Sequence, residues 1–299
     1  GVSSGPKFST LTSTPIDRAP AWMLAVVAMV SVQLGAAISV GLFEEVGVAG
    51  TAWLRITIGA VGFVLIARPR YWKWSRQELR APFLLGIVSA GMTLSFLAAI
   101  NLLPLGTAVA IEFLGPLTVA TIHSRSRRAL TWPALALVGV VLLTEPWEGT
   151  PSLLGIGFAV LSGIGWGLYI VITQHVGDRF AGVDGLAISM PVAAVVTMFV
   201  GLPQAWGHLT LEVLLVALGA AVLLPLIPWT LELYALRRLT KAAFGTLMAL
   251  EPALALAIGI LVLRQIPAGA QVVGMGCVVL AGVAAERTGR RQDVLGDFL

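Results

Sequence analysis

Ten apolar stretches alternate with short polar segments along the 299 residues of the chain. About 20 apolar residues in a helix span a bilayer core of about 30 Å, so these stretches predict membrane-spanning helices separated by loops. The predicted spans are residues 20–43, 48–67, 81–101, 104–122, 132–144, 153–174, 185–203, 212–234, 242–263 and 267–285. The fifth stretch is short, which favours a start nearer Leu130 or a small tilt. The pattern predicts an all-α integral membrane protein with ten helices.

Composition agrees with this fold class. Hydrophobic residues make up 58% of the chain and charged residues 11%, against about 45–50% and about 25% in soluble domains. Residues 1–19 are rich in Ser, Thr and Pro and lack the regions of a signal peptide, so we expect a flexible cytoplasmic tail there. Residues 286–299 are predicted to form a second cytoplasmic tail. The sole cysteine, Cys277, excludes a disulfide within the chain.

Positive charge falls on one side of the predicted topology. When the loops are assigned alternately to two sides, all but two of the 19 lysines and arginines lie in one set of loops and in the two tails. The opposite loops hold only Arg264, and Arg55 lies inside a span. Basic residues gather on the cytoplasmic side of membrane proteins, so both termini are predicted to be cytoplasmic. The same rule accounts for the net charge of +4, so we expect contact with the lipid bilayer and no nucleic-acid partner.

The two halves of the chain resemble each other at a constant shift. Leu114 and Pro116 in the fourth predicted span correspond to Leu250 and Pro252 in the ninth. The fifth span corresponds in the same way to the tenth. Each half contains five spans, so the second half enters the membrane in the opposite orientation to the first.

Residues 20–144 and 153–285 are therefore predicted to form two inverted five-helix repeats around a central cavity. This arrangement recurs in secondary transporters, whose substrate sites lie near the middle of the membrane. A duplicated channel or membrane enzyme is an alternative.

Three ionisable residues stand out deep inside predicted spans, where a charge costs at least about 2.5–3.5 kcal/mol. Arg55 and Glu112 lie at similar depths, which predicts either a buried ion pair that fixes packing or two groups in a substrate path. Glu251 has no basic partner at its depth. It is predicted to be either a carboxyl that titrates during transport or a protonated carboxyl bonded to a neighbouring carbonyl.

Other polar and aromatic residues are candidates for the cavity wall. Trp166 and Tyr169 share one face of the sixth span, and Gln33 and Asn101 offer uncharged hydrogen-bonding groups. Glu232 is close to the predicted cytoplasmic end of its span, beside Arg237 and Arg238, which favours an interfacial side chain that reaches toward water.

Prolines mark candidate hinges. Gly115 and Pro116 occupy the place in the first repeat that Pro252 occupies in the second, and Pro225 and Pro228 lie in the eighth span. A proline removes one backbone hydrogen bond of a helix, which leaves a carbonyl free and allows the helix to bend.

Enzyme signatures are missing from the sequence. The three histidines lie in separate loops on both predicted faces, and the phosphate-binding motif GxxxxGK[ST] does not occur. We therefore expect no metal, no cofactor and no enzymatic activity. Any uphill transport would use an ion or solute gradient, with protons as the candidate ion.

Two long segments carry a family resemblance. Residues 96–120, FLAAINLLPLGTAVAIEFLGPLTVA, and residues 227–259, IPWTLELYALRRLTKAAFGTLMALEPALALAIG, resemble the EamA type of the drug/metabolite transporter superfamily. With Arg55 in AWLRITIGA, the pattern is most similar to the bacterial threonine/homoserine exporter branch, and the similarity runs from the first predicted span to the tenth.

The resemblance implies two inverted five-helix repeats around a central cavity and the export of small metabolites, especially amino acids, across the inner membrane. The chain departs from the family pattern at two places. Leu94 and Leu97 stand where the family has tyrosines, and Arg264 and Gln265 replace a usual Gly-Glu pair. No site residue is carried over from the family.

The resulting hypothesis is a secondary-active exporter of small neutral amino acids, such as threonine and homoserine, in the bacterial inner (plasma) membrane. One alternative is a broader drug or nucleoside exporter. Another is a non-transporting membrane scaffold or a lipid-handling subunit. A central cavity lined by the polar residues named above distinguishes the two exporters from the scaffold, and the pattern of exported solutes distinguishes the exporters from each other.

Overall fold

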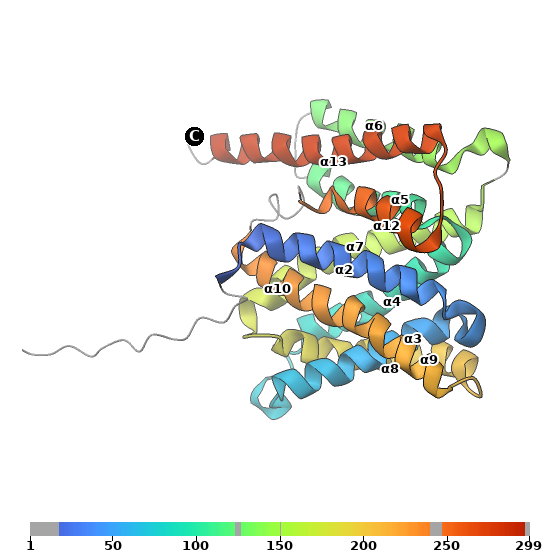
Figure 1. Ribbon diagram of the computed structural model, residues 1–299. Coiled ribbons are helices and arrows are strands. Elements are labelled where there is room, and N and C mark those ends of the chain that lie inside the picture. The colour runs from blue at the N-terminus through green and yellow to red at the C-terminus, as the bar shows by residue number, and fades with distance from the viewer. Residues whose placement is uncertain (1–17, 123–126, 150, 240–246, 297–299) are drawn as a thin grey trace, which may run out of the picture.

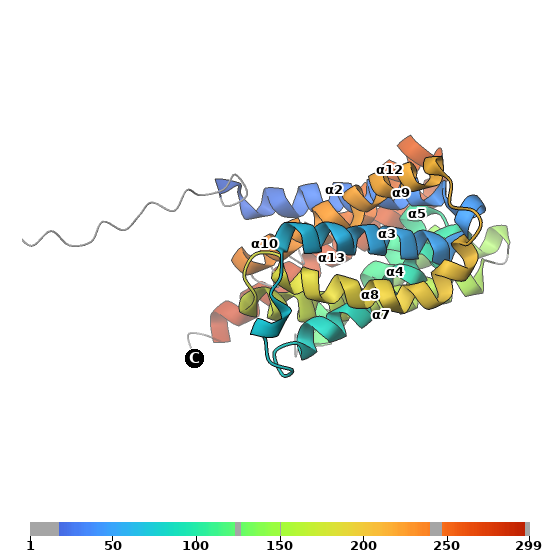
Figure 2. The same cartoon turned by 90° about the horizontal axis from the view of Figure 1, so that it is seen from below.

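The computed structural model describes residues 18–122, 127–149, 151–239 and 247–296. All regular elements in these ranges are helices, which pack side by side in one bundle (Figure 1). The long helices are α2 (Ala21–Val40), α3 (Phe43–Ala67), α4 (Arg80–Leu102), α5 (Leu105–Ile122), α6 (Thr131–Thr144), α7 (Leu153–Arg179), α8 (Asp184–Ala205), α9 (Leu211–Ala221), α10 (Ile227–Arg238), α12 (Glu251–Leu263) and α13 (Gly269–Gly296). Helix α2 begins and α13 ends at the same end of the bundle, as Figures 1 and 2 both show.

Seven helical segments of the described chain are long and apolar enough to cross a membrane. Three shorter apolar helices, Leu105–Thr118, Glu251–Leu263 and Gly269–Ala285, accompany them. Together they fall where the sequence predicts its ten spans. The start of the predicted span 242–263 lies outside the described residues.

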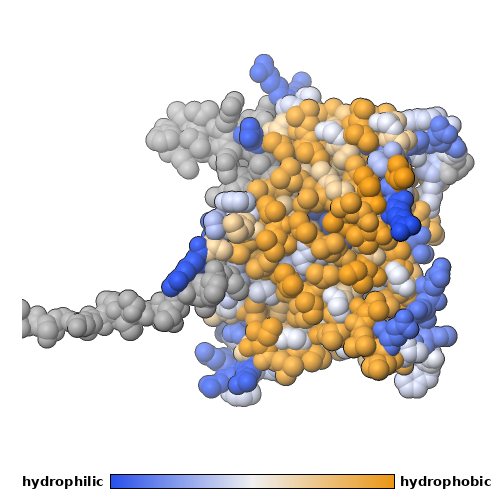
Figure 3. Space-filling model, in the orientation of Figure 1, coloured by the Kyte–Doolittle hydropathy of each residue, from blue (hydrophilic) through white to orange (hydrophobic). Residues whose placement is uncertain are grey.

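The outer surface of the bundle is apolar. Phe199 and Leu261 expose 74% and 77% of their surface, and Figure 3 shows hydrophobic residues across the side of the bundle with hydrophilic residues gathered toward its two ends. In water such a surface would be strongly unfavourable, because exposed apolar area costs about 25 cal/mol per Å². The protein is therefore a multi-pass membrane protein whose sides face lipid.

Close packing between helices depends on glycines. A Cβ atom on Gly115 of α5 would collide with the carbonyl oxygen of Gly163 on α7, and one on Gly163 would lie 2.6 Å from the carbonyl oxygen of Glu112. Gly139 of α6 and Gly274 of α13 approach each other in the same way. Small residues allow two backbones to come this close within a membrane, where helix association relies on packing.

The eighth predicted span is not one continuous helix. It consists of α9 and α10, joined by a wide turn, Val222–Leu226, in which Leu224 has the non-helical angles φ −162° and ψ 106°. The hydroxyl of Ser31 on α2 donates a hydrogen bond of 2.5 Å to the carbonyl of Leu223. This bond satisfies a backbone acceptor close to the break, which a lipid environment requires.

The candidate hinge residues differ in their surroundings. Pro225 lies in the turn between α9 and α10, and Pro228 lies in the first turn of α10. Pro252 lies in the first turn of α12, directly after a turn at Ala249 and Leu250. In contrast, α5 continues through Pro116 as one helix.

The crossing of α5 and α7 provides a test of the packing. Gly115→Ala should destabilise the protein, because overpacking of this kind typically costs about 1–3 kcal/mol. Gly157→Ala in α7 is the matched control, since a Cβ atom there meets nothing within 4 Å. The midpoint of thermal unfolding in detergent should fall for Gly115→Ala and stay the same or rise for Gly157→Ala. Equal midpoints would contradict the assigned crossing.

Candidate functional site

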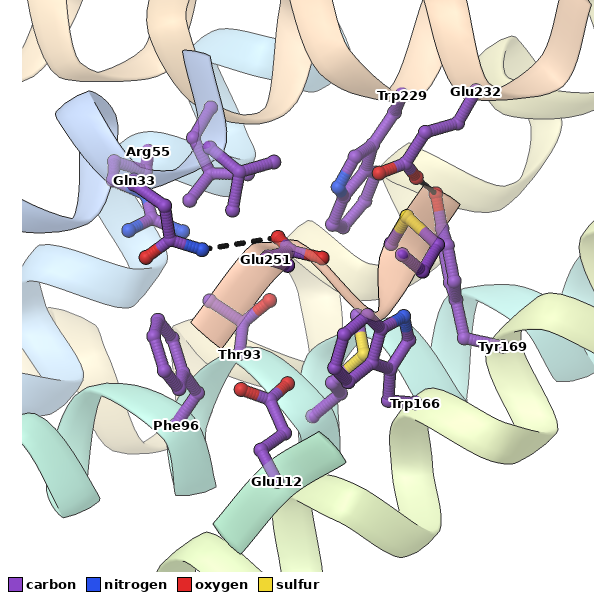
Figure 4. A pocket seen from close by; sticks show the side chains of 14 residues that line it. Gln33, Arg55, Thr93, Phe96, Glu112, Trp166, Tyr169, Trp229, Glu232 and Glu251 are labelled. Carbon is purple, nitrogen blue, oxygen red and sulfur yellow. Dashed lines mark hydrogen bonds between the residues drawn. The ribbon is translucent and has the colours of Figure 1, made fainter. Parts of the chain in front are cut away.

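A cavity lies inside the bundle, between helices from both halves of the chain. Side chains from α2, α3, α4, α5, α7, α10 and α12 line it (Figure 4). The volume of the cavity is about 60 Å³. On the same measure, about 10–15 Å³ is enough for one water. The cavity therefore has room for a small polar solute.

Glu251 lies in the middle of this cavity and contacts Gln33, which lies toward one end (Figure 4). The Gln33 Nε2 group of α2 donates a hydrogen bond of 3.0 Å to Glu251 Oε1, in the first residue of α12. Gln33 Oε1 and Glu251 Oε2 are buried without a hydrogen-bond partner among the described residues. The sequence predicts either a titrating carboxyl or a carboxyl bonded to a carbonyl, and the partner in the structure is the Gln33 amide.

Arg55 lies at one end of the cavity and is only 2% exposed. Its Nη1 group donates a hydrogen bond of 2.9 Å to Ser39 Oγ, whereas its Nε has no partner in the described chain. In the part of the chain that the structure describes, no ion pair joins Arg55 to Glu112. Both side chains line the cavity and lie apart in Figure 4. The described residues therefore do not contain the predicted ion pair, and a role of the two groups in a substrate path stays a prediction.

Glu112, Trp166 and Tyr169 also line the cavity, as the sequence predicts. Helix α5 contributes Glu112, and α7 contributes the two aromatic residues. The Trp166 ring packs against Phe113, with ring centroids 6.0 Å apart. This contact holds the indole ring beside the cavity.

The interfacial position predicted for Glu232 is wrong. Glu232 is 5% exposed and lines the cavity, where the hydroxyl of Tyr169 donates a hydrogen bond of 3.0 Å to its Oε2. Arg237, which suggested an interface, directs its Nε and Nη2 groups to backbone carbonyls of Gly177, Phe180 and Gly182. Glu232 therefore faces the interior of the bundle.

Trp229 is a cavity residue that the sequence analysis missed. Its ring lies 5.3 Å from that of Tyr169, centroid to centroid. Trp229 and Glu232 are three residues apart on α10 and so share one helix face. This spacing of three residues is the sequence signal that could have identified both as cavity residues.

The cavity-wall prediction for Asn101 is also wrong. Asn101 is exposed in the last turn of α4, outside the cavity, whereas Thr93 and Phe96 of the same helix line it. Five residues turn an α-helix by about 140° beyond one full turn, so Asn101 and Phe96 lie on different faces.

No group of three or more His, Cys, Asp and Glu residues that could hold a metal ion occurs among the described residues.

Comparisons with known proteins agree on one family. Residues 153–284 match the EamA-like transporter family. The chain is 33% identical to the threonine/homoserine exporter RhtA of Salmonella typhimurium (strain LT2), over 92% of this chain and 95% of that protein. It is also 33% identical to RhtA of Escherichia coli (strain K12), over 95% of this chain and 98% of that protein.

One solved structure, titled "Crystal structure of protein", has the same fold with a TM-score of 0.62 and 19% sequence identity. The match covers 91% of this chain and 98% of that structure. Sequence identity over nearly the full length decides the classification. The chain belongs to the EamA-like transporter family of the drug/metabolite transporter superfamily, in the branch of the threonine/homoserine exporters.

Proposed function

We propose that the protein is a secondary-active exporter of small neutral amino acids, such as threonine and homoserine, across the bacterial inner membrane. The observation that carries this proposal is a cavity that presents a buried guanidinium and several carboxyl groups to the same small volume. A neutral amino acid has one carboxylate and one ammonium group, which complement this arrangement. The exporter relatives support the direction of transport.

Each cavity residue has a role in this proposal. Arg55 binds the substrate carboxylate, since a guanidinium matches a carboxylate with two parallel hydrogen bonds. Glu251 and Glu112 face the substrate ammonium, and Gln33 orients Glu251 through its hydrogen bond. Trp166 and Tyr169 form the wall. A scaffold protein would have no use for these buried charges, which are costly to place in a membrane.

The proposed architecture is ten membrane-spanning helices in two inverted repeats, residues 20–144 and 153–285. Helix contacts support it, because they occur in pairs that the repeat relates. Helix α4 packs on α7 as α10 packs on α2, and α5 packs on α7 as α12 packs on α2. Helix α4 also packs on α8 as α9, in the corresponding span, packs on α3. Three further contacts join helices that correspond to each other, namely α3 with α8, α5 with α12 and α6 with α13.

Alternating access would move these repeats against each other around the cavity. The break at Val222–Leu226 and the start of α12 at Glu251 supply two places where a span can bend, next to Pro225, Pro228 and Pro252. Gly115 and Pro116 supply the corresponding place in the first repeat. Protons are the proposed coupling ion, because Glu251 can exchange a proton when water reaches it from one side at a time.

Transport by the purified protein tests the function directly. Proteoliposomes should take up labelled threonine and homoserine, and Arg55→Leu should lower the rate about tenfold or more. Hydrogen bonds to charged groups contribute about 1.5–3 kcal/mol, and 1.4 kcal/mol corresponds to a factor of ten. The control is Arg76→Leu in the exposed loop between α3 and α4, which should keep the wild-type rate. Equal rates for both variants would remove Arg55 from the site, and absence of uptake by the wild type would overturn the function.

Proton coupling makes a second prediction. In inside-out vesicles, an acidic lumen should stimulate uptake of threonine by the wild type. Glu251→Gln should still bind threonine but should respond no longer to the pH gradient, because an amide cannot carry the proton. Glu148→Gln, at an exposed position, should behave as the wild type does. A normal gradient response in Glu251→Gln would make Glu251 a structural residue.

The proposed orientation places the loop between α3 and α4 in the cytoplasm and the loop between α6 and α7 outside. Single cysteines at the exposed positions Gln77 and Glu148, introduced into a Cys277→Ser background, report on the two loops. A membrane-impermeant thiol reagent should label Glu148→Cys in intact cells and Gln77→Cys only after the cells are opened. The reverse pattern, or equal labelling, would contradict cytoplasmic termini.

A further inference from the structure

We propose that the end of the cavity formed by Glu232, Tyr169, Trp166 and Trp229 is a subsite for the substrate side chain, and that it selects side chains with a hydrogen-bond donor. The natural ligands of this subsite are amino acids with a hydroxyl group. The inference rests on the proposed function and adds the group that determines specificity.

The cavity has two chemically different ends. Arg55 and Gln33 lie at one end, Glu251 lies between, and Glu232, Tyr169 and Trp229 lie at the other (Figure 4). A zwitterionic head group held by Arg55 and Glu251 occupies the first end. The side chain of that substrate then extends toward Glu232.

Glu232 has unused capacity to accept hydrogen bonds. A carboxylate offers about four acceptor sites, and in the described chain the only hydrogen bond to the side chain of Glu232 comes from the neutral hydroxyl of Tyr169. Arg237 does not compensate the charge, because it is directed to the carbonyls of Gly177 and the turn that follows α7. A buried carboxylate with a single neutral donor favours any ligand that brings another donor.

The aromatic walls narrow the choice of ligand. Trp166, Tyr169 and Trp229 are all buried, and the Tyr169 and Trp229 rings lie against each other at 5.3 Å. They restrict this end of the cavity to a slim side chain and exclude much of the water that would otherwise solvate Glu232. An apolar side chain placed there would leave the carboxylate without a donor. Sites of this kind reject an analogue that lacks the hydroxyl far more strongly than sites that recognise shape alone.

Homoserine and norvaline provide the matched pair of substrates, since norvaline replaces the terminal hydroxyl of homoserine with a methyl group. In proteoliposomes, the wild type should transport homoserine at least about tenfold faster than norvaline at low concentration. Glu232→Leu should bring this ratio close to one, with norvaline transport retained. Glu212→Leu, an exposed glutamate at the start of α9 in the same predicted span, is the control and should keep the wild-type ratio.

A second variant separates selectivity from structural support. Tyr169→Phe keeps the ring and removes the donor to Glu232, so the homoserine preference should persist or increase. Loss of the preference in Tyr169→Phe would overturn the proposal, as would an equal reduction of both substrates in Glu232→Leu. Wild-type transport of homoserine and norvaline at equal rates would overturn it even if the variants fail to fold, while leaving the proposed function intact. Failure of the wild type to transport threonine and homoserine would overturn both.

Discussion

Burial of ionisable groups in a bundle surrounded by lipid is the constraint on which the rest of this structure depends. Arg55, Glu112, Glu232 and Glu251 are all buried, and all four line one cavity instead of being distributed through the bundle. A charge that faces lipid is strongly unfavourable, so these groups must share a polar interior. The outward-facing positions are accordingly apolar. Concentrating the polar groups in this way produces the polar cavity that we propose as the binding site.

Hydrogen bonds between side chains of different helices keep that interior ordered. Gln33 links α2 to α12, and Tyr169 links α7 to α10. The first bond joins the two halves of the chain, and the second joins two helices of the second half. The bonds that position these helices therefore also fix the shape of the cavity. Elsewhere the helices are held by close backbone contact at glycines such as Gly115 and Gly163, where a side chain would not fit between the helices.

Much of the fold and part of the site could be predicted from the sequence. The apolar stretches located the helices because hydrophobic length is a direct requirement of the bilayer. Arg55, Glu112 and Glu251 were identified as candidates because a charge in an apolar span is conspicuous, and all three line the cavity. Glu232 was misplaced because neighbouring arginines suggested the membrane surface, and distance along the chain does not reveal which way a helix face points. The contact between Gln33 and Glu251 joins opposite parts of the chain, so it depends on packing that local patterns do not specify.

The division of the eighth predicted span has a mechanical consequence. Both α9 and α10 pack on α2, but α9 also packs on α3, whereas α10 packs on α7 and is bound by Arg237 to the end of α7. The break at Leu224 lies between these two sets of contacts. The exchange of α3 for α7 as a packing partner therefore takes place within one span and not between spans. Two conformational states of this protein are best compared with the halves of this span as separate units of superposition, because each half shares contacts with a helix that the other does not touch as closely.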